Sequence, residues 1–123
     1  MKKKIILVYL FVIFLVSGCS EKATTVKETQ LDVVEVNITA DKVMVPSEIN
    51  IKKGTIVRFL NSIEKYSPNI IIYPANEKPV KEKVIAKSEN INPGESWEYT
   101  FEISGEFIAK DIYSNINGKI IVE

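Results

Sequence analysis

Two side chains that carry much of protein chemistry are nearly absent from this sequence. The chain has no histidine and one cysteine, Cys19. Histidine is the commonest metal ligand and the side chain that exchanges protons near neutral pH. Without histidine, hydrolysis would depend on Ser–Lys pairs or paired carboxylates, and no serine stands in a nucleophile-elbow motif. The sequence therefore predicts a protein that is not an enzyme and has no disulfide or Cys-based metal site in its main domain.

The beginning of the chain predicts export. Three lysines, Lys2, Lys3 and Lys4, precede an unbroken apolar run over residues 5–16. A basic segment followed by a short apolar segment is typical of a secretory signal. A transmembrane helix needs about 20 apolar residues, so the run is too short for a permanent span.

The end of the apolar run resembles the lipobox of bacterial lipoproteins. Residues 15–19 read Leu-Val-Ser-Gly-Cys, with small residues before the lone cysteine. The resemblance implies cleavage after Gly18, which makes residues 1–18 a signal peptide, and a diacylglyceryl thioether on Cys19. Two acyl chains suffice for stable anchoring. We expect a membrane partner through the Cys19 lipid and a location on the outer face of the bacterial cytoplasmic membrane, facing the periplasm where the host has two membranes.

The rest of the chain divides into a tether and one domain. Residues 20–30 are polar and without periodicity, so residues 19–30 are interpreted as the lipidated cysteine with a flexible tether, and residues 31–123 as one domain. Removing the three lysines of the signal leaves thirteen basic residues against sixteen acidic ones, a net charge of −3. This mildly acidic balance gives no reason to expect a nucleic acid partner.

Alternation of apolar and polar residues predicts that the domain is all-β. Residues 70–73 are apolar without interruption, which indicates a strand covered on both faces. Turn residues punctuate the runs, and about seven or eight short strands of this kind predict a sandwich of two sheets. The predicted strands lie near residues 34–38, 49–51, 55–60, 69–73, 96–102, 107–110 and 119–122.

Two further segments carry expectations about their place in the sheets. Trp97, Tyr99 and Phe101 alternate with polar residues, and we expect them to form core on a central strand. Residues 78–87 carry four lysines among apolar residues, which favours an exposed edge strand protected by charge against pairing.

The order of several short motifs resembles the cupredoxin family over nearly the whole domain. The motifs are Pro46 with residues 49–57, Asn61 after the following strand, Asn-Pro-Gly-Glu at 92–95, Gly-Glu-Phe at 105–107 and Gly-Lys-Ile-Ile-Val at 118–122. The resemblance implies a Greek-key β-sandwich of the cupredoxin type.

The copper ligands of that family do not carry over. The resemblance puts Asn69 where a histidine normally follows a proline. It puts Lys110, or Asp111 in a register shifted by one residue, at the cysteine position. Tyr113 and Ile116 fall at the second histidine and the methionine. Blue copper needs thiolate and imidazole ligands, so we expect no blue-copper centre and no one-electron transfer.

A narrower resemblance suggests a different ion. Residues 88–94 and 114–119 resemble the cupredoxin-like domain of periplasmic iron-uptake lipoproteins, in which carboxylates have replaced histidine ligands. It implies a candidate site of Glu89, Asp111 and Asn69, whose oxygens would suit a hard cation such as calcium, manganese or iron. No cofactor is expected apart from such a cation.

Three tyrosines near the predicted loops leave two interpretations open. Tyr66, Tyr73 and Tyr113 either form a binding rim for a protein or sugar, or fill the space that the metal left. The first functional hypothesis is a non-redox binding or structural module with a protein partner in the cell envelope. The alternative is an extracytoplasmic metal-handling protein, accessory to uptake.

Overall fold

The computed structural model describes residues 32–123. The predicted signal peptide, Cys19 and tether lie outside these residues. The strands are β1 (Val33–Ile38), β2 (Met44–Val45), β3 (Glu48–Ile51), β4 (Thr55–Asn61), β5 (Ile70–Pro74), β6 (Ala86–Lys87), β7 (Ser96–Phe101), β8 (Gly105–Asp111) and β9 (Asn117–Val122). A single 3-10 turn, η1 (Lys81–Lys83), is the only helical element in this part of the chain. No helix among these residues has the length and apolarity needed to cross a membrane.

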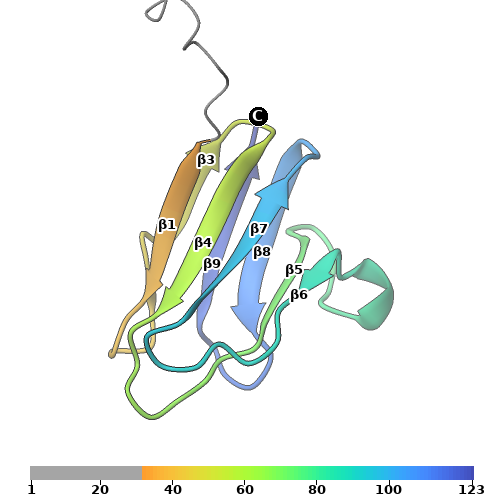
Figure 1. The fold of residues 1–123 in the computed structure, drawn as a ribbon. Helices are drawn as coiled ribbons and strands as arrows, with labels where there is room; N and C mark the ends of the chain where they lie inside the picture. Colours follow the sequence, from red (N-terminus) through yellow and green to blue (C-terminus); the bar gives the residue numbers. More distant parts are fainter. Residues whose placement is uncertain (1–31) are drawn as a thin grey trace, which may run out of the picture. The chain divides into compact units, whose positions relative to one another are not determined.

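The strands form two layers, visible in Figure 1. Sheet A has the order β2-β1-β4-β7, and sheet B has the order β3-β9-β8-β5-β6. The β1–β4 and β3–β9 pairs are parallel, and the other pairs are antiparallel. The predicted all-β sandwich is confirmed. Nine strands appear, rather than seven or eight, because β2 and β6 contain only two residues each and leave no periodic signal.

The core lies between the two sheets and follows the alternation in the sequence. In β4 every second side chain is buried, and Val57 and Phe59 are completely enclosed. Ile70 and Ile72 of β5 belong to the same core cluster. Ile71 and Tyr73, whose side chains point to the opposite face of sheet B, are also buried. The prediction that residues 70–73 are covered on both faces is confirmed.

The predicted position of the aromatic strand β7 is wrong, because β7 is an edge strand that pairs only with β4. Phe101 is buried, while Trp97 and Tyr99 are partly exposed and pack against the core from one side. The rings are stacked in sequence, with Phe59–Trp97 and Trp97–Tyr99 centroids 5.7 and 6.1 Å apart. Period-2 alternation identifies the face of a strand and not its place in the sheet.

The lysine-bearing segment 78–87 does reach the edge of sheet B, but mostly not as a strand. Only β6 pairs with β5, through Ala86 and Lys87, and η1 precedes it. Pro79 supplies no N–H donor for a sheet ladder, which agrees with the irregular backbone before β6. The edge position is confirmed and the length of the predicted strand is corrected.

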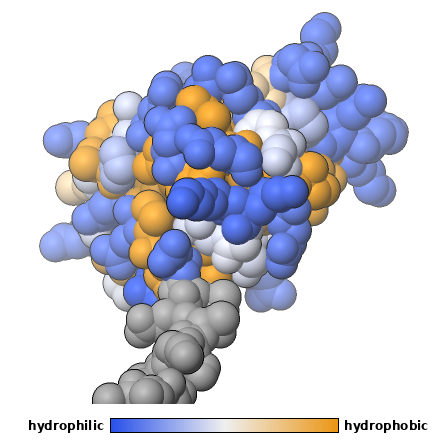
Figure 2. Space-filling model, turned by 90° about the horizontal axis from the view of Figure 1, so that it is seen from above, coloured by the Kyte–Doolittle hydropathy of each residue, from blue (hydrophilic) through white to orange (hydrophobic). Residues whose placement is uncertain are grey.

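The two ends of the sandwich differ in composition. At one end lie Asp32 and Glu123, where the described chain begins and stops. Figure 2, which views the domain from above, shows a mainly hydrophilic surface with scattered hydrophobic residues. At the other end, called here the loop end, lie the connections 62–69, 88–95 and 112–116. Apart from Tyr73 of β5, the side chains predicted to form a site come from these connections and from the adjacent end of β8.

Candidate functional site at the loop end

Asn61 holds two of the connections at the loop end in place. It is the last residue of β4 and is completely buried. Its amide nitrogen donates to the carbonyls of Tyr66 (2.7 Å) and Ile91 (2.9 Å), and its amide oxygen accepts from the backbone of Ile63 at 2.8 Å. Because one side chain satisfies three backbone groups, it fixes the position of Tyr66 relative to the segment that follows β6.

Asp111 is the buried carboxylate of this end. It is the last residue of β8 and lies on the same inward face as Phe107 and Ala109. One carboxylate oxygen accepts the backbone N–H of Asn69 at 2.9 Å. The other oxygen accepts the Ser114 hydroxyl at 2.7 Å and the Tyr66 hydroxyl through a short hydrogen bond. Tyr66 and Asn69 belong to the connection 62–69, and Ser114 belongs to the connection 112–116. The carboxylate therefore joins these two loops.

The protonation of this cluster follows from its contacts. Burial raises the pKa of the Asp111 carboxyl, but the hydrogen bonds from Tyr66, Asn69 and Ser114 favour the charged form and outweigh burial, so its pKa lies below the ordinary value. Burial and the bond to Asp111 raise the pKa of Tyr66 above its ordinary value. At neutral pH the cluster is therefore a carboxylate bonded to a neutral phenol.

The positions that the resemblance aligns with copper ligands have different roles here. Of the two registers, Asp111 is the residue that points inward, whereas the Lys110 ammonium donates to backbone carbonyls of Asp111 and Ser114. Ile116 is buried in the core, and Tyr113 is 65% exposed. Met44, which is buried, packs against Gly118. This donor set of carboxylate, phenol and amide does not fit a blue-copper ion, which takes thiolate and imidazole.

Asn69 and Glu89 line a surface hollow of about 750 Å³ next to the cluster. Asp111 does not line it, because its carboxylate lies behind the Asn69 backbone. The three predicted cation ligands are thus neighbours without facing a common point. Within residues 32–123 no group of three or more His, Cys, Asp or Glu side chains could hold a metal ion. The full lining is Asn69, Lys87, Ser88, Glu89, Asn90, Asn92 and Tyr113.

The Asn69 side chain has one unsatisfied atom. Asn69 is 8% exposed, and its amide nitrogen donates to Asn90 at 3.3 Å. Its amide oxygen is buried and has no hydrogen-bond partner within the described part of the chain. A buried acceptor without a donor costs free energy, about 1–3 kcal/mol, so this oxygen favours any group that can donate to it.

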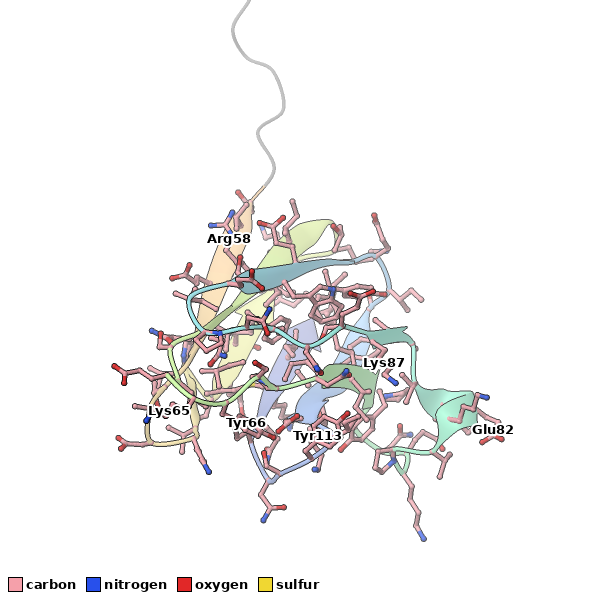
Figure 3. The ribbon with its side chains drawn as sticks, turned by 60° about the horizontal axis from the view of Figure 1, so that its bottom comes forward. Arg58, Lys65, Tyr66, Glu82, Lys87 and Tyr113 are labelled. Carbon is pink, nitrogen blue, oxygen red and sulfur yellow. The ribbon has the colours of Figure 1, made fainter. Side chains whose placement is uncertain are left out.

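The three predicted rim tyrosines lie in three different environments. Tyr66 is half-buried and bonded to Asp111, and the Lys42 ammonium lies 5.5 Å from its ring centroid. Tyr113 is exposed, and Figure 3 shows it on the same end of the domain as Tyr66. Tyr73 is buried within β5, and burial raises the pKa of its hydroxyl. Its side chain is therefore not part of the surface at the loop end.

Two serines, Ser88 and Ser62, make hydrogen bonds near the loop end that the sequence did not predict. Ser88 is buried, accepts the backbone N–H of Ile70 at 2.8 Å and donates to the carbonyl of Glu89 at 2.6 Å, which holds the wall of the hollow against β5. Ser62 stands three residues before Lys65, a Ser-x-x-Lys spacing. Its exposed hydroxyl donates to Asn37 at 2.7 Å.

Comparison with solved structures identifies the fold. The chain is similar to a purple cupredoxin from Nitrosopumilus maritimus, with 21% identity and a TM-score of 0.64 over 73% of this chain and 99% of that one. A mutant amicyanin in the Cu(I) form matches with 18% identity and a TM-score of 0.62, over 78% and 87% of the two chains. Auracyanin A, a blue copper protein from Chloroflexus aurantiacus, matches with 19% identity and a TM-score of 0.60, over 76% and 100%.

No protein family description and no curated protein sequence matches the chain. The likeness to the solved structures, at 21% identity or less, concerns the arrangement of strands. Together with the two sheets described above, it shows that residues 32–123 form a cupredoxin-like β-sandwich domain.

Proposed function

We propose that this chain is a lipid-anchored extracytoplasmic protein whose cupredoxin-like domain acts as a non-redox binding or structural module. The observation that carries this proposal is the state of Asp111. In one of the two registers of the resemblance its carboxylate lies at the position of the copper-binding cysteine, and it accepts hydrogen bonds from Tyr66, Asn69 and Ser114.

A metal at this position would have to displace those donors. Each bond to a charged acceptor contributes about 1.5–3 kcal/mol, and the Asn69 N–H would remain buried without an acceptor. A carboxylate and a phenol also have no one-electron chemistry near the potentials that thiolate-bound copper provides. The cluster therefore supports a structural role in joining the loops, with recognition left to the surface outside it.

The proposed anchor rests on the lipobox-like residues 15–19 and the basic and apolar segments before them. Within the domain, Ile56 N–H donates to the Asp32 carbonyl at 2.9 Å, so the first described residue is held at the start of β1. The strand then runs away from this point toward the loop end. A lipid on Cys19 would attach to the end of the domain opposite the cluster.

One observation favours the alternative of metal handling. Glu89 and Asn69, whose amide oxygen is unpaired, line the same hollow, and oxygen ligands suit hard cations such as calcium or manganese. A single carboxylate and an amide form a weak site, which is why this function stands second.

The lipid is tested by mass spectrometry of the full-length protein purified from bacterial membranes. We expect a mass that corresponds to loss of residues 1–18 and addition of a diacylglyceryl group, and we expect Cys19→Ser to remove both, leaving a precursor that keeps residues 1–18 and carries no lipid. An unmodified Cys19 in the membrane fraction would contradict the proposed anchor.

The non-redox role is tested on the same preparation by native mass spectrometry with Cu(I), Cu(II), Fe(II), Mn(II) and Ca(II). We expect no stoichiometric copper binding in either oxidation state, and tight copper binding would overturn the proposal. Stoichiometric binding of Fe(II), Mn(II) or Ca(II) that disappears in Glu89→Gln, but not in the exposed control Glu82→Gln, would put metal handling first.

A further inference from the structure

The hollow at the loop end has the chemistry of a recognition site. Most of its lining is neutral and polar, with three asparagines and a serine, and one lysine and one glutamate add a single charge of each sign. The lining therefore contains both hydrogen-bond donors and acceptors. Ligand sites use a small number of such groups to orient a bound molecule.

An aromatic ring stands at the side of the hollow. Tyr113 lines it and is 65% exposed, the largest exposure among the aromatic and large apolar side chains of the described domain. Exposing a tyrosine ring to water has no benefit for the fold, since apolar surface is favoured in the interior. An exposed ring beside polar groups is suited to a ligand that has one apolar face and a polar rim.

A second hollow lies next to the first. A neighbouring hollow of about 300 Å³ shares Lys87, Glu89 and Asn90 with the first and is lined further by Trp97. The edge position of β7 leaves Trp97 partly exposed there. A ligand of several units could therefore contact Tyr113 at one end and Trp97 at the other.

The Asn69 amide, whose oxygen is unpaired, restricts which ligand groups can bind beside it. Asn90, which accepts from the Asn69 nitrogen at a long 3.3 Å, is exposed and can turn away at small cost. A group that is both donor and acceptor could then take its place, donate to the Asn69 oxygen and accept from the nitrogen. A hydroxyl group does this, whereas a cation or a carbonyl satisfies only one of the two atoms.

From these observations we propose that the two neighbouring hollows bind a saccharide chain through Tyr113, Trp97 and the Asn69 amide. A sugar ring has hydroxyl groups around its rim and C–H groups on its faces, which matches the polar lining and the exposed ring. This inference deepens the proposed binding function and rests on it. The residues that line the hollows belong to the loop end, and Asp32 lies at the opposite end of the domain.

The test is titration calorimetry of the full-length lipoprotein in lipid nanodiscs with two soluble probes, chitotetraose and maltotetraose. We expect at least one probe to bind at millimolar concentration or below. Tyr113→Ala should weaken that binding about tenfold, as expected for loss of a stacked ring. Ile103→Ala is the control, because Ile103 is 63% exposed in the turn between β7 and β8, away from the hollows, and this variant should bind unchanged.

A second variant tests the Asn69 amide separately. Asn69→Ala should also weaken binding about tenfold, whereas Asn90→Ala should change it by less than about threefold, since Asn90 turns away in the bound state. The thermal unfolding midpoint is measured for each variant, and only variants that remain folded at the temperature of the titration are compared.

Absence of binding by both probes, or binding that Tyr113→Ala leaves unchanged, would overturn the proposal. Cation binding that requires Glu89, with no saccharide binding, would assign the hollow to the metal-handling alternative. The proposed anchor and the non-redox role are measured independently, by the mass of the lipidated protein and by the copper titration. Failure here is therefore distinguishable from failure of the proposed function.

Discussion

The two ends of the sandwich differ in where their polar groups lie. At the end that carries Asp32 and Glu123, the strands stop at the surface, and backbone groups pair directly, as in Glu123 N–H to Ile51 O at 2.8 Å. The hollow at this end, about 430 Å³, is lined largely by exposed residues such as Asp32, Asn50 and Lys52. Its charged groups remain in water, where they cost and contribute little.

At the loop end the polar groups are inside the protein. Asn61, Asn69, Ser88 and Asp111 are all buried and connect segments that are far apart in sequence. A buried polar network stabilises one conformation strongly when its members are satisfied and is expensive when one member is removed. The comparison indicates that buried polar contacts fix the conformation of the loop end, whereas the opposite end keeps most of its polar groups in water.

Removing the central carboxylate should have the largest effect. Asp111→Ala leaves the donors of Asn69, Tyr66 and Ser114 without their acceptor, and we expect the free energy of unfolding to fall by about 3 kcal/mol. The measurement is equilibrium unfolding in urea. The matched change Asp32→Ala at the opposite end should alter stability by less than about 0.5 kcal/mol. Equal effects of the two changes would show that the ends do not differ as described.

Asn61 gives the next largest expected effect. Asn61→Ala removes three hydrogen bonds to backbone groups of two loops, and we expect a loss of about 2 kcal/mol together with faster amide hydrogen exchange at Ile63, whose N–H loses its acceptor. Asn50→Ala, an exposed asparagine at the opposite end, is the control and should change neither quantity measurably. Unchanged exchange in Asn61→Ala would mean that the loops are held by other contacts.

Much of this architecture is readable in the sequence because side-chain alternation is a local property. The strands around Val57, Ile70 and Phe107 follow from their own neighbours. The inward direction of Asp111 was also readable, since it continues the spacing of Phe107 and Ala109 and excludes Lys110. That alternation was a stronger signal than the family resemblance, which left Lys110 and Asp111 as alternatives.

Other features depend on contacts that alternation does not encode. The edge position of Trp97 depends on which strands pair, and the unpaired Asn69 oxygen depends on a loop 21 residues away. The hollow likewise forms from β6, the following loop and Tyr113, which the sequence separates. The resemblance grouped Glu89, Asp111 and Asn69, but nothing in these residue types indicates that the Asn69 backbone lies between the Asp111 carboxylate and the hollow.

The pH dependence of stability offers the finest test of the difference between the ends. The pKa of Asp111 is lowered in the folded protein, so its contribution is fully present above the unfolded value of about 3.9 and is lost as the pH falls through the folded pKa. The pKa of Tyr66 is raised, so its contribution is present below about pH 10 and is lost above it. Unfolding in urea between about pH 2 and 6 should therefore show a decline that Asp111→Asn makes shallower.

Asp32→Asn is the matched control for this decline, because Asp32 is exposed at the opposite end and the change removes the same charge from the protein. We expect the acid decline of this variant to follow that of the unmodified protein. Tyr66→Phe should remove part of the loss of stability at alkaline pH, and the part that arises from the net charge of the protein should remain. If Asp32→Asn and Asp111→Asn flatten the acid decline equally, the decline reflects net charge alone, and the hydrogen-bonded carboxylate would not be what distinguishes the loop end.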